Sequence, residues 1–279
     1  MAKLFKKAAD PNTEMSFLDH LEALRWHLVR AIAAILVVAI AAFVNKNIVF
    51  DKIIFAPKYG DFLSYRALCK LSELLHIDFC IEDISFELIN INISGQFTIH
   101  IMVSAIAGIV LAFPYILWEF WSFIKPALKP GELKYTRGVV FFSSLLFALG
   151  VLFGYYVITP LSVNFLGGYQ VSENVANQID LSSYIYTVSV LTLASGLVFE
   201  LPIVIYFLSK VGLVNPTFLK VYRKHAIVLI LILAAIITPS PDIISQVIVA
   251  IPLFFLYQIS IYVSAVVTRR RARELEDTD

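Results

Sequence analysis

The sequence predicts an all-α integral membrane protein with six transmembrane helices, of which the fifth is short. Of its 279 residues, 59% are hydrophobic and 15% are charged, and the mean hydropathy is +0.81. A soluble domain is typically about 45–50% apolar and about 25% charged. Two further observations support the prediction, namely a series of long apolar segments and an uneven distribution of basic residues. The composition excludes a disordered chain, a disulfide scaffold and an ordinary cytosolic enzyme.

Six apolar segments follow one another along the chain, and a helix needs roughly 20 apolar residues to cross the hydrocarbon core. Their approximate boundaries are 26–44, 99–124, 138–159, 185–209, 226–237 and 243–267. The fifth has only 12 uninterrupted apolar residues, and the cluster TPSPD separates it from the sixth. A Pro-rich break between two apolar runs predicts a tight hairpin of two helices. We therefore expect one membrane domain over 26–267, in which the fifth helix is too short to span a bilayer unaided.

The basic residues divide unevenly between the two sides of this domain. Seventeen of the 22 Lys and Arg residues lie before residue 31, in the loops 125–137 and 210–225, or in the tail 268–279. The other five lie in the long external loop 45–98. Because cytoplasmic loops carry an excess of Lys and Arg, this asymmetry predicts six spans with both termini in the cytoplasm. Five spans would place the basic tail outside, against the rule.

The N-terminal stretch 1–25 is polar and ends in a segment with helical periodicity. Apolar residues recur at positions 17, 18, 21, 24 and 28, with Asp19, Glu22 and Arg25 between them. This spacing is typical of an amphipathic helix, and Ser16 is suited to cap its start. We expect this helix to lie in the cytoplasmic interface before the chain enters the membrane. A plain interfacial anchor would also explain the pattern.

Two acidic residues are placed within or near the end of an apolar segment. Glu200 lies in the interior part of the fourth span, and an ionisable group there is a candidate for function because a charge in the membrane is costly. The alternative is a structural carboxylic acid that is hydrogen-bonded to a neighbouring helix. Pro202 follows two residues later and is expected to bend the helix, because proline removes a backbone hydrogen bond. Glu119, near the inner end of the second span, is expected to be an interfacial acid exposed to headgroups and water.

The sequence contains no metal-ligand spacing, no phosphate-binding glycine loop and no nucleophile motif. We therefore expect no enzymatic activity, no cofactor, no metal site and no nucleic-acid partner. The five histidines are scattered and are expected to be surface or interface residues. Cys69 and Cys80 both fall in the long external loop, where they could form a disulfide in an oxidising compartment. Their spacing leaves that pairing open.

Several longer stretches carry a more specific signal. They are, in order, MSFLDHLEALRWHL, FAP at 55–57, FWSFIKPALKPGE at 120–132, FELPI around Glu200, and TPSPDIISQ at 238–246 followed by AIPLFFLYQI. Together they resemble one family, TatC, the multi-span receptor subunit of the twin-arginine protein translocase. Any one stretch would be weak, but their order over about residues 15–268 and their placement on the predicted spans make the resemblance specific.

The resemblance implies a curved, glove-like bundle of six helices whose last two are too short to cross the membrane fully. It also implies a protein of the bacterial cytoplasmic (inner) membrane that binds twin-arginine signal peptides at its cytoplasmic face. Its partners would be TatA/TatB-type single-span proteins, further copies of itself in a receptor complex, and membrane lipid. Together they would export folded proteins independently of the Sec pathway, driven by the proton-motive force.

The resemblance further implies roles for individual residues. Glu132 matches a glutamate implicated in twin-arginine recognition, and a carboxylate can pair with a guanidinium through two parallel hydrogen bonds. The other matched positions are Phe123 and Pro126 on the same binding surface, Leu24 and Arg25 at the end of the amphipathic helix, Glu200 in the fourth span, Asp242 and Gln246 at the external hairpin, and Pro57 in the first external loop.

One position departs from the family pattern. That pattern reads H-L-x-E-L-R in the N-terminal helix, whereas this sequence has His20, Leu21, Glu22, Ala23, Leu24 and Arg25. Ala23 thus stands where the family has the glutamate that acts with the loop glutamate on the arginines. Glu22 is adjacent, but it is rotated by about 100° around a helix of roughly 3.6 residues per turn. Either Glu22 substitutes through a shift of the helix, or the site is weakened, or Ala23 is an engineered substitution.

Two other classes of protein are kept as alternatives. A proton-coupled secondary transporter of a small solute would use Glu200 as its proton carrier. Such folds usually show repeated halves and helices broken at the midplane, and we find no convincing internal repeat. A structural membrane scaffold without a binding site is the second alternative, and the acid Glu132 within a basic cytoplasmic loop argues weakly against it.

Overall fold

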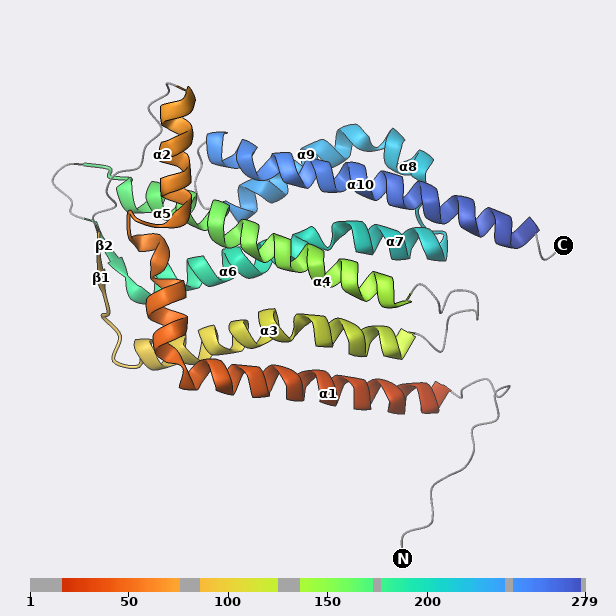
Figure 1. The fold of residues 1–279 in the computed structure, drawn as a ribbon, viewed down its shortest axis with the longest axis horizontal. Coiled ribbons are helices and arrows are strands. Elements are labelled where there is room, and N and C mark those ends of the chain that lie inside the picture. The colour runs from red at the N-terminus through yellow and green to blue at the C-terminus, as the bar shows by residue number, and fades with distance from the viewer. Residues whose placement is uncertain (1–16, 76–85, 125–135, 173–176, 239–242, 277–279) are drawn as a thin grey trace, which may run out of the picture.

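The computed structural model describes residues 17–75, 86–124, 136–172, 177–238 and 243–276. It confirms the predicted helical membrane fold, to which two short strands are added (Figure 1). Within the described residues, five helical segments are long and apolar enough to cross a membrane. They are His20–Val44, Gly95–Ile124, Gly138–Gly168, Leu181–Val211 and Ser245–Arg270.

The first two long helices, α1 (Phe17–Val44) and α3 (Gly95–Ile124), pack side by side. The amphipathic segment predicted to precede the first span is not a separate helix here, because α1 runs on through it without interruption. No Pro or Gly stands between its first and last residues to break the helix. Gly108 lets the two helices approach closely, since a Cβ atom there would lie 2.8 Å from the Ile35 carbonyl oxygen.

The third and fourth spans are both irregular. In the third, α4 (Thr136–Phe153) continues through a π-helical turn, Gly154–Ile158, into α5 (Thr159–Gly168). In the fourth, α6 (Leu181–Phe199) and α7 (Leu201–Val211) meet at Glu200. This interruption agrees with the effect predicted for Pro202, which lies in the first turn of α7 and cannot donate a backbone hydrogen bond.

The last part of the chain combines a short helix with a long one. After α8 (Pro216–Val221), α9 (Arg223–Ile237) has 15 residues, so the predicted short fifth helix is present. In contrast, α10 (Ile243–Glu276) has 34 residues and is longer than predicted, extending into the segment expected to be a separate tail. Its interior proline, Pro252, does not end the helix, and the isolated glutamines leave a 26-residue apolar segment within it.

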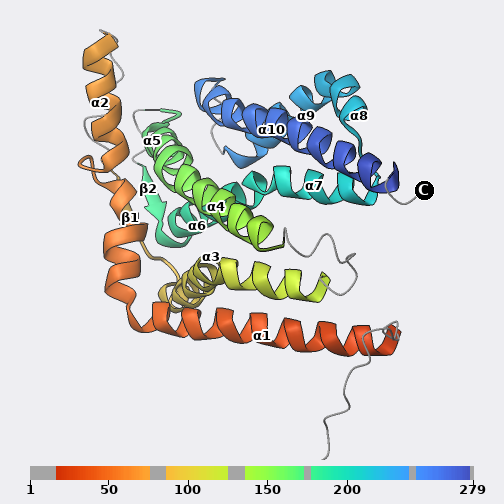
Figure 2. The ribbon, with the colours of Figure 1, turned by 45° about the vertical axis from the view of Figure 1, so that its right-hand side comes forward.

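The helices are arranged from α1 at one edge of the bundle, through α3, to α4 and α6, and then to α9 and α10 at the other edge (Figures 1 and 2). The start of α1, the end of α3 and the end of α10 lie at the same end of the bundle, which we call the terminal end. The opposite end carries α2, β1 and β2, and we call it the cap end.

The cap end holds structure within the long loop that the sequence left unassigned. A π-helical segment, Ile48–Ile54, leads through a short 3-10 turn to α2 (Leu63–Leu75). Strand β1 (Glu87–Ile89) then pairs in parallel with β2 (Gln178–Asp180). Of the two cysteines whose pairing was left open, Cys69 is disulfide-bonded, and Cys80 lies outside the described residues.

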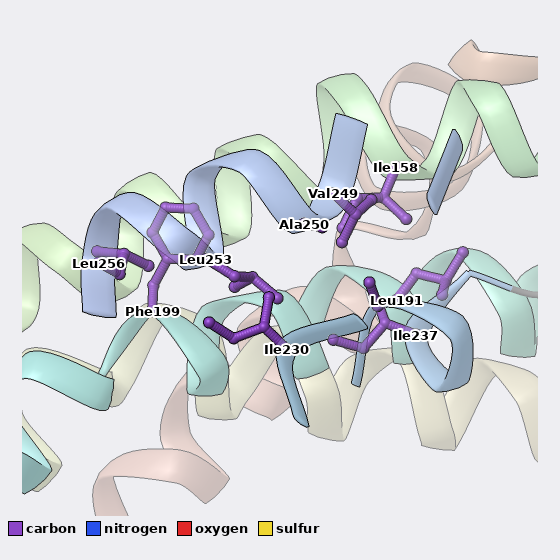
Figure 3. Packing of buried hydrophobic residues seen from close by; sticks show 10 residues of the cluster. Ile158, Leu191, Phe199, Ile230, Ile237, Val249, Ala250, Leu253 and Leu256 are labelled. Atoms are coloured by element: carbon purple, nitrogen blue, oxygen red, sulfur yellow. The ribbon is translucent and has the colours of Figure 1, made fainter. Parts of the chain in front are cut away.

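A buried apolar cluster holds the α9–α10 pair against α6 (Figure 3). Leu253 and Val249 of α10 are almost completely buried, and Ala234 of α9 is fully buried between the two helices and their neighbours. The full cluster consists of Ile158, Leu191, Phe199, Ile230, Ala234, Ile237, Val249, Ala250, Leu253 and Leu256. Van der Waals packing within this cluster holds the short helix α9 in place, although that helix has few residues of its own.

Candidate functional site

A buried carboxylate lies between α1 and α3 near the terminal end. Glu119 is only 5% exposed. Its Oε2 atom lies 2.5 Å from Nδ1 of His27, and Tyr115 donates a hydrogen bond of 2.7 Å to Oε1. The guanidinium of Arg30 approaches Oε1 to 3.8 Å. We call these four residues the Glu119 cluster.

The prediction that Glu119 faces headgroups and water is therefore wrong. Its burial depends on α1, because the histidine and the arginine that surround the carboxylate come from that helix. A buried charge needs such partners to offset the loss of hydration. The sequence could have indicated one of these contacts. Tyr115 precedes Glu119 by four residues on α3, and residues four apart lie on the same helix face.

Phe123, a predicted site residue, lies one helical turn beyond Glu119. Its ring stacks on the His20 ring, with centroids 4.3 Å apart, and meets the His27 ring edge-on at 6.2 Å. His20, Ala23 and His27 are all half-buried, and their spacing places them on one face of α1. The two histidines are thus interface residues, as expected, and the structure places Phe123 against the N-terminal helix.

The remaining residues predicted for this site fall into two groups. Glu22, Leu24 and Arg25 are exposed and alternate with the half-buried face of α1 that carries His20 and His27. Pro126 and Glu132 lie outside the described residues. The described helices on either side of them, α3 and α4, end and begin at the terminal end of the bundle (Figure 1).

Glu200 lies at the junction of α6 and α7, and its side chain is oriented toward α4. The Ser143 hydroxyl, which is fully buried, donates a hydrogen bond of 2.5 Å to Glu200 Oε2. The second carboxylate oxygen is buried as well. The acid therefore connects α4 to the junction of α6 and α7. This geometry is the one expected of a structural carboxylic acid that is hydrogen-bonded to a neighbouring helix. A functional role for Glu200 stays a proposal.

Gln246, predicted to contact a partner helix, connects the two helices of the last hairpin. Its Nε2 atom donates a hydrogen bond of 3.0 Å to the Leu231 carbonyl of α9. The neighbouring Ser245 is buried. Asp242, predicted to act beside Gln246, lies outside the described residues. The position of Gln246 at the start of α10 places it toward the cap end of the hairpin (Figure 1).

Pro57, predicted to be structural, is buried at the cap end. Its carbonyl accepts a hydrogen bond of 3.0 Å from the Tyr65 hydroxyl, which also reaches the Pro160 carbonyl at 3.2 Å. Tyr65 is completely buried, and burial raises the pKa of its phenol, so the group keeps its proton and acts as a donor. This tyrosine ties the external loop to the start of α5.

Replacement of Tyr65 by Phe is expected to lower the free energy of unfolding by about 1–3 kcal/mol, because buried carbonyls lose their donor. Thermal or denaturant unfolding of the purified protein in detergent measures the change. Tyr59→Phe is the matched control, because that tyrosine is 56% exposed. Equal unfolding midpoints for Tyr65→Phe and the unmodified protein would contradict this role.

Comparisons with known proteins agree over most of the chain. A family model described as Sec-independent protein translocase protein (TatC) matches residues 19–252. The Sec-independent protein translocase protein TatC of Blattabacterium is 44% identical over 261 residues, which cover 92% of this chain and 98% of the relative. The protein of the same name from Aquifex aeolicus is 35% identical over 258 residues, again covering 92% and 98%.

A solved structure gives the same result in three dimensions. The crystal structure described as the twin-arginine translocase receptor TatC is 35% identical to this chain and superimposes with a TM-score of 0.65. The match covers 89% of this chain and 99% of that one. The similarity therefore includes nearly the whole membrane domain rather than a single motif.

Proposed function

The chain belongs to the TatC family, whose members are non-enzymatic membrane components of Sec-independent protein translocases, and we propose that it binds twin-arginine signal peptides at the terminal end of its bundle. The observation that carries this proposal is the packing of Phe123 against His20, with the buried carboxylate of Glu119 one turn away. Aromatic and acidic side chains are thereby gathered where the α3–α4 connection leaves the membrane domain.

The proposal places the terminal end in the cytoplasm of a bacterium, with the chain in the inner membrane. Basic residues support this orientation, because most of them lie in segments that begin or end at the terminal end. Both termini are then cytoplasmic. A signal peptide on a folded cargo protein would meet this face before export.

Recognition of the peptide would rest on paired charges. The twin arginines carry two guanidinium groups, and each prefers a carboxylate that can accept two parallel hydrogen bonds. Glu132, in the connection between α3 and α4, is the proposed first carboxylate, with Phe123 and Pro126 shaping the surface beside it. Leu24 and Arg25 would contribute from the exposed face of α1, and Glu22 is a candidate for a second carboxylate there.

The apolar part of the signal peptide would then follow the bundle toward Glu200. Asp242 and Gln246 would help the single helix of a TatA/TatB-type partner to settle against α9 and α10. The short α9 rises only about 22 Å, whereas the hydrocarbon core is about 30 Å thick. The resulting mismatch would thin the bilayer locally. Association of further copies and partners around this point would build the complex that exports folded proteins with the proton-motive force.

Site-specific photo-crosslinking tests this function directly. A photoreactive residue at position 123 should capture a twin-arginine signal peptide, and a twin-lysine version of the same peptide should be captured much less. The same probe at position 246 should capture the partner's single helix. Equal capture of both peptides from position 123 would contradict the receptor function.

A further inference from the structure

The Glu119 cluster contains one partner that is held less firmly than the others. His27 and Tyr115 each approach a carboxylate oxygen within hydrogen-bond distance. The Nη1 atom of Arg30 lies 3.8 Å from Glu119 Oε1, which is too far for a hydrogen bond. Its side chain is 52% exposed, and its Nε atom instead donates to the Trp26 carbonyl at 3.2 Å.

The carboxylate of Glu119 therefore has unused capacity to accept hydrogen bonds. An ionised carboxylate offers about four lone-pair sites. The described contacts occupy one on Oε2 and one on Oε1. The loosely placed guanidinium of Arg30 marks the side from which a guanidinium group reaches Oε1.

The surroundings of Glu119 suit the side chain of an incoming peptide. Phe123 lies one turn closer to the terminal end, and the His27 ring contacts both Phe123 and Glu119. Ala23, one turn before His27 on the same face of α1, presents only a methyl group. An acidic group thus lies one helical turn from the stacked Phe123 ring, between α1 and α3.

We propose that Glu119, rather than the exposed Glu22, is the second carboxylate of the peptide site, and that one arginine of the signal peptide displaces Arg30 from it. This inference rests on the proposed function. Two adjacent guanidinium groups call for more than one carboxylate, and Glu119 is the buried one that the described part of the chain places beside Phe123. Arg30 acts as an internal competitor that occupies the position until a peptide arrives.

Substitutions of Glu119 and Arg30 are expected to change peptide binding in opposite directions. Glu119→Gln should weaken binding of a labelled twin-arginine signal peptide about tenfold, because a charge-assisted acceptor is lost. Arg30→Gln should tighten binding severalfold, because the competitor is removed. Arg66→Gln and Glu87→Gln are controls of the same chemistry at the cap end, and both should bind like the unmodified protein.

The experiment is a fluorescence titration of that peptide against each full-length variant in phospholipid nanodiscs. Tighter binding by Arg30→Gln supports the displacement even if Glu119→Gln fails to fold. Unchanged or weaker binding by Arg30→Gln, while the unmodified protein binds the peptide and Glu132→Gln does not, overturns this inference alone. Failure of the unmodified protein to bind the peptide overturns the proposed function and this inference together.

Discussion

Replacement of Glu132 by Gln is expected to weaken binding of a twin-arginine signal peptide about ten- to hundredfold. Glutamine keeps the size of the side chain but loses the charge and one of the two acceptor oxygens. A bidentate pair with a guanidinium can then no longer form. The loss should appear mainly as faster dissociation of the peptide, because removing one member of a hydrogen-bonded charge pair chiefly raises the dissociation rate.

Titration of labelled peptide against the purified protein measures this effect, with Glu87→Gln as the control. Glu87 is exposed and lies in β1 at the opposite end of the bundle, so its loss should leave binding unchanged. If Glu132→Gln bound the peptide as tightly as the unmodified protein, the loop carboxylate would have no part in recognition.

Replacement of Gly150 by Leu is expected to have the largest effect on stability. A Cβ atom at this position would lie 2.7 Å from the Ser195 carbonyl oxygen and 2.7 Å from Phe199 Cβ, both on α6. A Cβ atom at Gly196 on α6 would in turn lie 2.8 Å from Phe147 Cε2 on α4. Overpacking typically costs about 1–3 kcal/mol, and here a backbone carbonyl of Ser195 and the base of the Phe199 side chain stand in the way, neither of which is the far end of a flexible side chain. We expect about 3 kcal/mol or more.

Thermal unfolding in detergent and the yield of monodisperse protein both report this loss. Gly138→Leu is the matched control on the same helix, because a Cβ built there meets no atom of another described segment within 4 Å. Comparable stability of the two leucine variants would show that close approach of α4 and α6 is not needed for the fold.

The membrane helices could be predicted from the sequence because each depends on local information. An apolar run of sufficient length specifies a span whatever it packs against. The break at Glu200 was predictable for the same reason, since Pro202 acts on its own backbone. The glycine contacts between α4 and α6 show how the sequence also encodes the distance between helices.

The structure of the cap end and the burial of Glu119 depend instead on distant segments. Strand β1 pairs with β2, which lies far along the chain. Each strand is too short to be recognised from its own sequence pattern. Glu119 is buried because α1 brings His27 and Arg30 to it from 92 and 89 positions away in the chain. Such pairings follow from helix packing, which a hydropathy pattern does not specify.

The most direct test of the central claim compares two peptides on the unmodified protein. A labelled signal peptide with its natural arginine pair and the same peptide with a lysine pair are titrated against the protein in phospholipid nanodiscs. Lysine keeps the charge but lacks the planar fork that pairs with a carboxylate. We expect the arginine peptide to bind at least about tenfold more tightly than the lysine peptide. Equal affinity for the two peptides would contradict it.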